Sequence, residues 1–138
     1  MKLAWNEDLA IGIQAIDEQH KELFNRFGKM LEACNSGCGR EEIGNLLLFL
    51  NDYVHTHFRD EERLQQSKGF PDYAAHCEQH RIFIGKLNQL EQTLKDGGAS
   101  LTLVISANNM LLDWLVNHIA VMDKKIGQFL AANGARND

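Results

Sequence analysis

Hydrophobic residues recur at alternating steps of three and four positions along most of this chain, which is the spacing of one face of an α-helix. The second of four such stretches is the most regular, with inward positions at Ile43, Leu47, Leu50, Val54, His57, Glu61 and Leu64. The third repeats this spacing through Tyr73, His76, His80, Phe83, Leu87, Leu90 and Leu94. The first and fourth carry stripes of Leu23, Phe24, Phe27, Met30, Leu31 and Cys34, and of Leu101, Val104, Leu111, Leu115, His118 and Met122. Four amphipathic helices are therefore predicted.

Breaks that contain glycine separate these stretches, at 37–39, 68–69 and 97–98. Helices joined by such short loops pack as antiparallel neighbours. We therefore predict an all-α fold, an up-down-up-down four-helix bundle over about 17–131 behind an N-terminal arm over about 1–16, with 1–138 forming a single domain. Asp17 and Ser100 are expected to cap the first and fourth helices, and Pro71 suits the first turn of the third.

Composition narrows the classes of function. The chain of 138 residues carries a net charge of −5 and no strongly basic segment, which argues against nucleic acid as its main partner. No stretch approaches the ~20 apolar residues of a membrane span, and residues 1–10 lack the apolar run of a signal peptide. A cytoplasmic location is therefore expected.

The three cysteines, Cys34, Cys38 and Cys77, cannot all pair with one another. In a chain without an export signal, such an odd set is typical of free thiols. A zinc site is the alternative, but the sequence contains no C-x-x-C pair that would support it.

Titratable residues occupy positions where the helical pattern asks for leucine or isoleucine. They are His57, Glu61, His76, His80 and His118, and His20 extends the stripe of the first helix. Burying so many titratable groups is costly unless something binds them. A metal ion is the simplest compensation, because neutral imidazole and carboxylate are natural ligands. Taken alone, each of these histidines could be a core residue hydrogen-bonded to a backbone carbonyl. The combination of all these titratable residues on inward positions favours a metal site.

The sixth histidine, His55, does not fit this pattern. It precedes His57 by two residues, about 200° around a helix, so it should face away from the core. We predict a surface position for His55.

The motifs that carry these residues resemble the hemerythrin family, specifically the single-domain bacteriohemerythrins, from about Trp5 to Leu130. They are Ile16-Asp17-Glu18-Gln19-His20, His57-Phe58-x-x-Glu61-Glu62, His76-x-x-x-His80 and Trp114-Leu115-x-x-His118-Ile119-x-x-x-Asp123. One position departs from the resemblance, because Gln65 stands where many relatives have methionine. We expect this difference to alter packing near one end of the bundle without touching a ligand.

The resemblance implies a non-haem centre of two iron ions with a bridging oxo or hydroxo group. By that likeness His76, His80 and His118 would bind one iron, His20 and His57 the other, and Glu61 and Asp123 both. The second iron would then keep an open position, as reactive metal sites do. The implied function is reversible binding of dioxygen for transport, storage or delivery, without enzymatic activity. An oxygen-consuming enzyme is a candidate partner.

An oxygen pocket should lie beside the open position. Leu115, one turn before His118, and Phe24, one turn after His20, are candidates for its walls, with Phe58, Trp114 and Ile119 next to them. These residues could equally be ordinary core, and the two roles are compatible.

The spacing in the fourth helix raises a geometric difficulty. His118 and Asp123 lie five residues apart, about 140° out of alignment in a regular α-helix, yet both must reach the same metals. A π-bulge would realign them and let Ile126 and Leu130 continue the inward stripe. The alternative is a regular helix in which the Asp123 rotamer reaches the site.

Two other functions stay open at this stage. A di-iron oxidase would use a more carboxylate-rich site with Glu-x-x-His motifs. The inward stripes of this chain carry no such motif. A sensor of oxygen, nitric oxide or redox state usually joins a signalling module, for which the chain leaves no room after its fourth helix.

Overall fold

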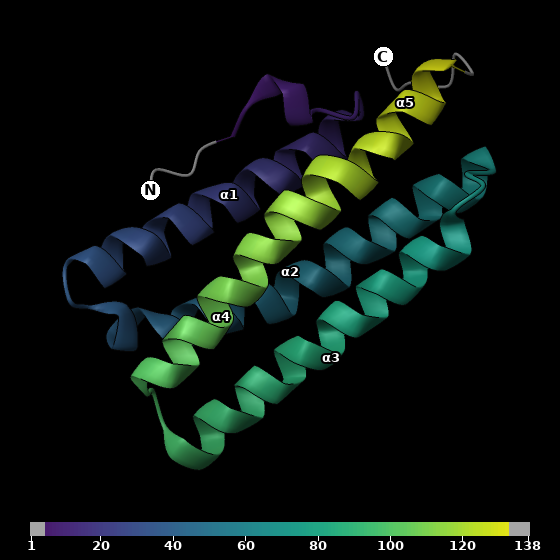
Figure 1. Ribbon diagram of the computed structural model, residues 1–138. Coiled ribbons are helices and arrows are strands. Elements are labelled where there is room, and N and C mark those ends of the chain that lie inside the picture. Colours follow the sequence, from purple (N-terminus) through teal and green to yellow (C-terminus); the bar gives the residue numbers. More distant parts are fainter. Residues whose placement is uncertain (1–4, 133–138) are drawn as a thin grey trace.

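The computed structural model describes residues 5–132, which are almost entirely helical and contain no strand. The long helices are α1 (Gln14–Asn35), α2 (Gly39–Lys68) and α3 (Tyr73–Gly97). The fourth rod of the bundle consists of α4 (Leu101–Asp113), the π-helix η2 (Trp114–Asp123) and α5 (Lys124–Ala132), which follow one another without a break. Figure 1 shows the rods side by side, with the short 3-10 helix η1 (Glu7–Leu9) in the arm before α1. The predicted four-helix bundle is confirmed.

Two of the three expected helix starts are wrong. The first helix begins at Gln14, three residues before Asp17, and Ile13 is its N-cap. The carboxylate of Asp17 instead accepts hydrogen bonds from the backbone N–H groups of Ile11 (2.8 Å) and Gly12 (3.2 Å), which ties the arm to α1. Pro71 lies in the turn before α3 rather than within its first turn.

The third expected start is confirmed. The Ser100 side chain accepts a hydrogen bond from the backbone N–H of Leu103 and so caps α4. At the other end of the bundle, Gly69 ends α2 with a positive φ of 68°, a conformation that glycine adopts without steric cost.

The apolar core is divided into two clusters. The main cluster includes Leu23, Leu50, Phe58, Phe83 and Leu115, and the end cluster consists of Ile11, Ile13, Ile16, Phe70, Ile126 and Leu130. On α1 the titratable residue His20 lies between Ile16 of the end cluster and Leu23 of the main cluster, and on the fourth rod Asp123 lies between Ile119 and Ile126 in the same way. The titratable residues therefore form a polar layer enclosed by hydrophobic packing on both sides.

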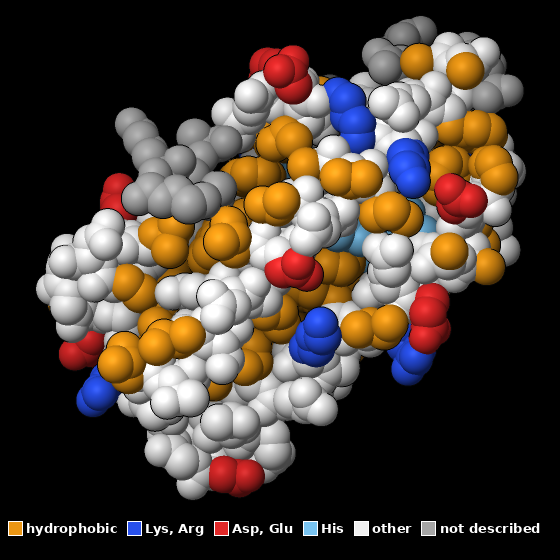
Figure 2. Space-filling view, viewed as in Figure 1, with side chains coloured by type: hydrophobic (Ala, Val, Ile, Leu, Met, Phe, Trp, Pro, Cys, Tyr) orange, Lys and Arg blue, Asp and Glu red, His pale blue; other side chains and the backbone are white. Residues whose placement is uncertain are grey.

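Most of the predicted inward residues are buried or half-buried, but one prediction fails at the end of the fourth rod. Leu101 is 57% exposed, since it occupies the first position of α4, beyond the packed part of the bundle. Figure 2 looks onto this rod and shows hydrophobic side chains at its surface. Leu101, Ile105, Val116 and Val121 of this rod are exposed. None of the described helices combines the length and the apolar character needed to cross a membrane.

The three cysteines are free thiols, as expected. Cys38 is exposed, and Cys34 and Cys77 are partly buried. No cysteine belongs to a potential metal-binding group in the described part of the chain, so the zinc alternative gains no support.

The close approach of the arm to α5 depends on Gly127. A Cβ atom there would lie 2.8 Å from Ile11 Cα and 2.9 Å from Ile11 O, closer than real Cβ contacts. We predict that Gly127→Ala lowers the free energy of unfolding by about 1–3 kcal/mol, because the arm must shift away from α5.

Gly85→Ala is the matched control, since a Cβ at this helical position on α3 meets nothing within 4 Å. It should stabilise the protein by about 0.5–1 kcal/mol through helix propensity alone. Urea unfolding of both variants measures the difference, and equal effects at the two sites would contradict the tight contact.

Candidate metal centre

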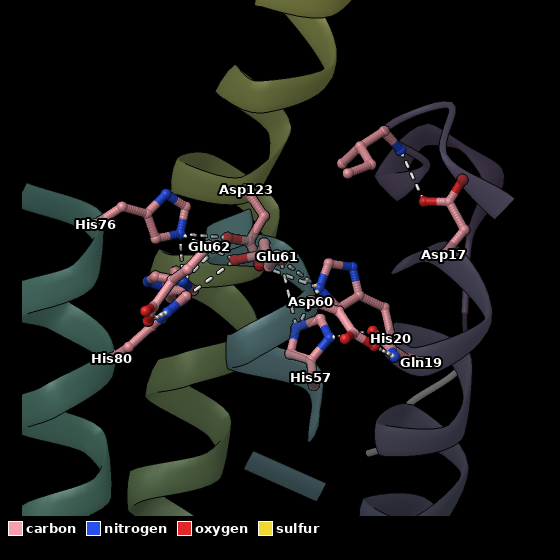
Figure 3. Close-up of polar contacts among 12 residues, drawn as sticks. Asp17, Gln19, His20, His57, Asp60, Glu61, Glu62, His76, His80 and Asp123 are labelled. Atoms are coloured by element: carbon pink, nitrogen blue, oxygen red, sulfur yellow. Dashed lines mark hydrogen bonds and ion pairs between the residues drawn. The ribbon is translucent and has the colours of Figure 1, made fainter. Parts of the chain in front are cut away.

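Seven titratable side chains meet in the polar layer, and all four rods contribute to it. The α1 helix supplies His20, α2 supplies His57 and Glu61, α3 supplies His76 and His80, and η2 supplies His118 and Asp123. Each is at most 3% exposed. Figure 3 shows Glu61 and Asp123 between the imidazoles of α3 on one side and those of α1 and α2 on the other. All seven residues predicted from the sequence are thus brought together, while His55 is exposed, as predicted.

The carboxylate of Glu61 faces both sides of this layer. Its Oε2 lies 3.4 Å from His20 Nε2 and 3.3 Å from His57 Nε2. Its Oε1 lies 3.2 Å from His76 Nε2 and 3.1 Å from His80 Nε2. One carboxylate can therefore donate an oxygen to each of two ions.

Asp123 is arranged in the same way. Its Oδ1 lies 2.7 Å from His76 Nε2 and 3.0 Å from His118 Nε2, and its Oδ2 lies 3.1 Å from His20 Nε2. Two groups of donor atoms result, each with all its atoms within 4.8 Å of one another. One group is Glu61, His76, His80, His118 and Asp123, and the other is His20, His57, Glu61 and Asp123.

The backbone of η2 is what brings Asp123 to the layer. The π-helix extends over the ten residues from Trp114 to Asp123, so the predicted departure from regular helix is confirmed and is longer than a single bulged turn. His118 and Asp123 consequently share the inward side, at 3% and 1% exposure. The inward stripe continues through Ile126 and Leu130, both of them buried.

Three imidazoles are oriented by acceptors on a neighbouring helix. His57 Nδ1 lies 2.7 Å from Gln19 Oε1, and His118 Nδ1 lies 2.7 Å from Gln79 Oε1. His80 Nδ1 lies 2.7 Å from Glu62 Oε2. Because an amide or carboxylate oxygen only accepts, each Nδ1 carries the proton, and the lone pair of each Nε2 points into the layer.

Sequence reasoning assigned no role to these three acceptors. Gln19, Glu62 and Gln79 each precede or follow a metal-ligand candidate by one residue, and Gln19 and Glu62 also stand in the motifs that resemble the hemerythrin family. Polar residues at such half-buried positions look like ordinary surface residues.

The five residues proposed to line an oxygen pocket all belong to the main cluster beside the polar layer. The Phe58 ring stacks on His80, with centroids 3.9 Å apart, and the Trp114 ring stacks on His118 at 3.6 Å. Phe24, Leu115 and Ile119 are buried in the same cluster, at 5%, 2% and 0% exposure.

Two surface cavities reach the histidines from outside. A cavity of about 510 Å³ ends at His57 and also borders Gln19 and Tyr53. A second, of about 310 Å³, ends at His118 beside Trp114. Phe58 and Phe24 border two other surface cavities, of about 310 and 460 Å³. Leu115 and Ile119 line none of these four cavities and pack within the core.

The protonation states show how the layer is balanced electrostatically. Burial alone would lower the pKa of His20 and His76, but the adjacent carboxylates of Asp123 and Glu61 raise it to about 10 and about 9. Burial lowers the pKa of His57 and His118. Burial would raise the pKa of Glu61 and Asp123, yet the surrounding imidazoles hold both below their usual values. Without a metal, two imidazolium groups therefore compensate two carboxylates.

The donor atoms also fit a metal chemically. Both Glu61 oxygens, His80 Nε2 and Asp123 Oδ2 are buried and have no hydrogen-bond partner among the described residues. Such atoms are costly to leave unsatisfied. Imidazole nitrogens with carboxylate oxygens are a donor set suited to first-row transition metals such as iron.

Comparison with known proteins agrees with this geometry. The family model described as the hemerythrin HHE cation binding domain matches residues 11–130. A bacteriohemerythrin of Methylococcus capsulatus is 38% identical over 116 residues, which cover 84% of this chain and 86% of that protein. A myohemerythrin of Sipunculus nudus is 26% identical over 121 residues, covering 88% of each chain. A crystal structure of a hemerythrin variant with leucine replaced by alanine superposes with a TM-score of 0.79 at 33% identity, covering 94% of this chain and 97% of the other. The chain belongs to the hemerythrin family.

Proposed function

We propose that this protein holds two iron ions in the polar layer and binds dioxygen reversibly. The observation that carries the proposal is the unequal division of the donors. One group has three imidazoles and the other has two, while Glu61 and Asp123 belong to both. An ion in the second group would have fewer protein ligands, which is the arrangement of a reactive site that keeps one position open.

The ligand assignment follows from this division. His76, His80 and His118 would hold one iron, His20 and His57 the other, and the two carboxylates would bridge them together with an oxo or hydroxo group. Iron bound there would supply the electrons for reversible binding of dioxygen, while the chain supplies position, orientation and exclusion of water.

We infer a carrier of dioxygen rather than an oxidase. Five neutral imidazoles and two carboxylates give the site less negative charge than the carboxylate-rich sites of di-iron oxidases. Less negative charge stabilises oxidised iron less well, which favours release of dioxygen over its consumption. A cytoplasmic location, one domain over 1–138 and an oxygen-consuming enzyme as partner stay predictions.

The surrounding side chains would keep the site dry and rigid. Leu115 and Ile119 are almost completely buried one turn before and one residue after His118, and they exclude solvent from that side. Phe58 and Trp114 stack on ligand imidazoles and restrict rotation of the rings.

An optical titration tests the proposal directly. The iron-loaded protein should gain a visible absorption band on aeration and lose it on removal of dioxygen, over repeated cycles. A protein that holds two irons but gives no reversible change on aeration would overturn the function while leaving the metal site intact.

The ligand assignment predicts that substitutions of two nearby histidines, His57 and His55, differ in their effect on metal content. His57→Ala should reduce the metal content from two ions to one per chain, because the second group would retain only His20 and the shared carboxylates. His55→Ala, an exposed position two residues away, should leave both ions bound. Elemental analysis of purified protein measures the ratio, and equal metal loss in the two variants would refute the assignment.

Metal binding should release protons at neutral pH. In the metal-free protein His20 and His76 are protonated at pH 7, since their pKa is raised to about 10 and about 9. Loading with Zn²⁺, which avoids redox chemistry, should displace about two protons per chain, and the apparent affinity should rise as pH increases from 7 toward 9. A pH indicator in weakly buffered solution measures the release. Binding of two ions without proton release would show that these imidazoles are neutral or are not ligands.

Leu115 is predicted to slow the loss of reversible dioxygen binding in air. Leu115→Ala keeps every ligand but opens the wall beside His118, so the variant should lose its reversible absorption change in air faster than the parent. It should also lower the free energy of unfolding by roughly 2–5 kcal/mol.

Leu103→Ala is the matched control for that experiment. Leu103 is equally buried in the main cluster, at 2% exposure, but lies three helical turns before Leu115. It should cost comparable stability without changing the rate of loss. The comparison is made at equal iron content, and equal rates in both variants would remove Leu115 from the proposed pocket.

A further inference from the structure

Gln65 is a buried polar residue that the proposed metal site does not use. Eight polar or charged side chains are buried among the described residues, and Gln65 is the one outside the seven-residue polar layer. It is 0% exposed, and neither its Nε2 nor its Oε1 has a hydrogen-bond partner within the described part of the chain. An amide buried in this way destabilises a fold unless another group binds it.

Two imidazoles of the polar layer lack the outer acceptor that the other three possess. The Nδ1 atoms of His57, His80 and His118 face side-chain oxygens at 2.7 Å. The Nδ1 atoms of His20 and His76 are buried and have no such partner among the residues described. When Nε2 binds a metal, Nδ1 must carry the proton, so both of these nitrogens become donors in need of an acceptor.

The position of Gln65 matches this need. It follows Glu61 by four residues on α2, so the two side chains lie on the same helical face, one turn apart. Its backbone carbonyl accepts a hydrogen bond from the N–H of Phe70 (2.9 Å), and the Phe70 ring lies 6.3 Å from the His76 ring. Gln65 therefore lies between the polar layer and the end cluster.

His20 and His76 face the same end of the bundle. Figure 3 shows both rings on the side of the layer toward α5 and the arm, with His57 and His80 on the opposite side. The two imidazoles without an outer acceptor thus lie on the side of the layer toward the end cluster, as Gln65 does.

We propose that Gln65 is a positioning residue: one buried water molecule accepts the outer imidazole protons of His20 and His76 and donates a hydrogen bond to Gln65 Oε1. Three polar groups are enough to hold such a water. The inference rests on the proposed metal site and deepens it, because it assigns the missing outer contacts of two ligands.

The test uses Gln65→Met, which preserves size but removes the acceptor, and Gln66→Met as control at the adjacent exposed position. Metal-free proteins are titrated with Co²⁺ alone, whose visible bands report affinity and coordination. Gln65→Met should bind two ions with an affinity lowered about 10–100-fold, while its metal-free form should unfold at the same or a higher urea concentration. Gln66→Met should match the parent in both measurements, and Gln65→Glu, which restores an acceptor, should recover most of the affinity.

The outcomes separate this inference from the proposal on which it rests. A parent that fails to bind two Co²⁺ ions would overturn the metal site itself. Binding of two ions by the parent and by Gln65→Met with equal affinity would overturn only the role of Gln65. A loss of affinity that merely accompanies a less stable metal-free protein, or that Gln65→Glu does not restore, would also overturn it.

A measurement on the parent does not depend on any variant folding. In the Zn²⁺-loaded protein, the Nδ1 protons of His20 and His76 should exchange slowly with solvent in NMR spectra. They should also show a nuclear Overhauser contact with the Gln65 side chain or with a trapped water. Slow exchange without either contact, or rapid exchange, would contradict the assignment.

Discussion

The bundle depends on how it compensates seven titratable side chains placed in its interior. Isolated charges there would be prohibitively expensive, so each must be paired. Glu61 and Asp123 provide the pairing, because each carboxylate faces imidazoles on both sides of the layer at 2.7–3.4 Å. The two apolar clusters then exclude water from above and below. A metal pair would replace the imidazolium protons as the positive charge, so that the same geometry serves folding and binding.

The polar layer also explains the irregular backbone of the fourth rod. A regular helix would point Asp123 about 140° away from His118, and only one of them could face the layer. The π-helix of η2 gives up regular hydrogen bonding over ten residues and brings both side chains inward. Departures from regular helix geometry are expected at functional sites, where the site requires side-chain positions that a regular helix cannot provide. The main cluster around η2 stabilises this segment, since Trp114, Leu115 and Ile119 are all buried in it.

The helical period of buried positions predicted the bundle and six members of the polar layer. The resemblance to the hemerythrin family added Asp123, which lies one residue off the inward stripe. The sequence indicated a π-bulge because a five-residue spacing misaligns His118 and Asp123 in a regular helix, but it left a regular helix with a reaching Asp123 rotamer open and did not indicate the ten-residue length of η2. The sequence was less informative where tertiary contacts determine the start of a helix or the burial of a side chain. Asp17 lies inside α1 because its carboxylate binds the arm, and Leu101 is exposed because the bundle packing does not extend to it. The outer acceptor Gln79 could not be distinguished from a surface residue, since nothing in its spacing sets it apart.

Those outer contacts connect the helices as well as orienting the ligands. Gln19 of α1 binds His57 of α2, Glu62 of α2 binds His80 of α3, and Gln79 of α3 binds His118 of η2. Each hydrogen bond therefore joins one rod to the next, and the contact between Asp123 and His20 joins the fourth rod to the first. Since these three imidazoles are each held by their own helix and by a neighbour, a shift of one rod would misplace donors on two. The register of the helices and the geometry of the metal centre are thus fixed by the same contacts, so a site assembled from four separate segments can still be rigid.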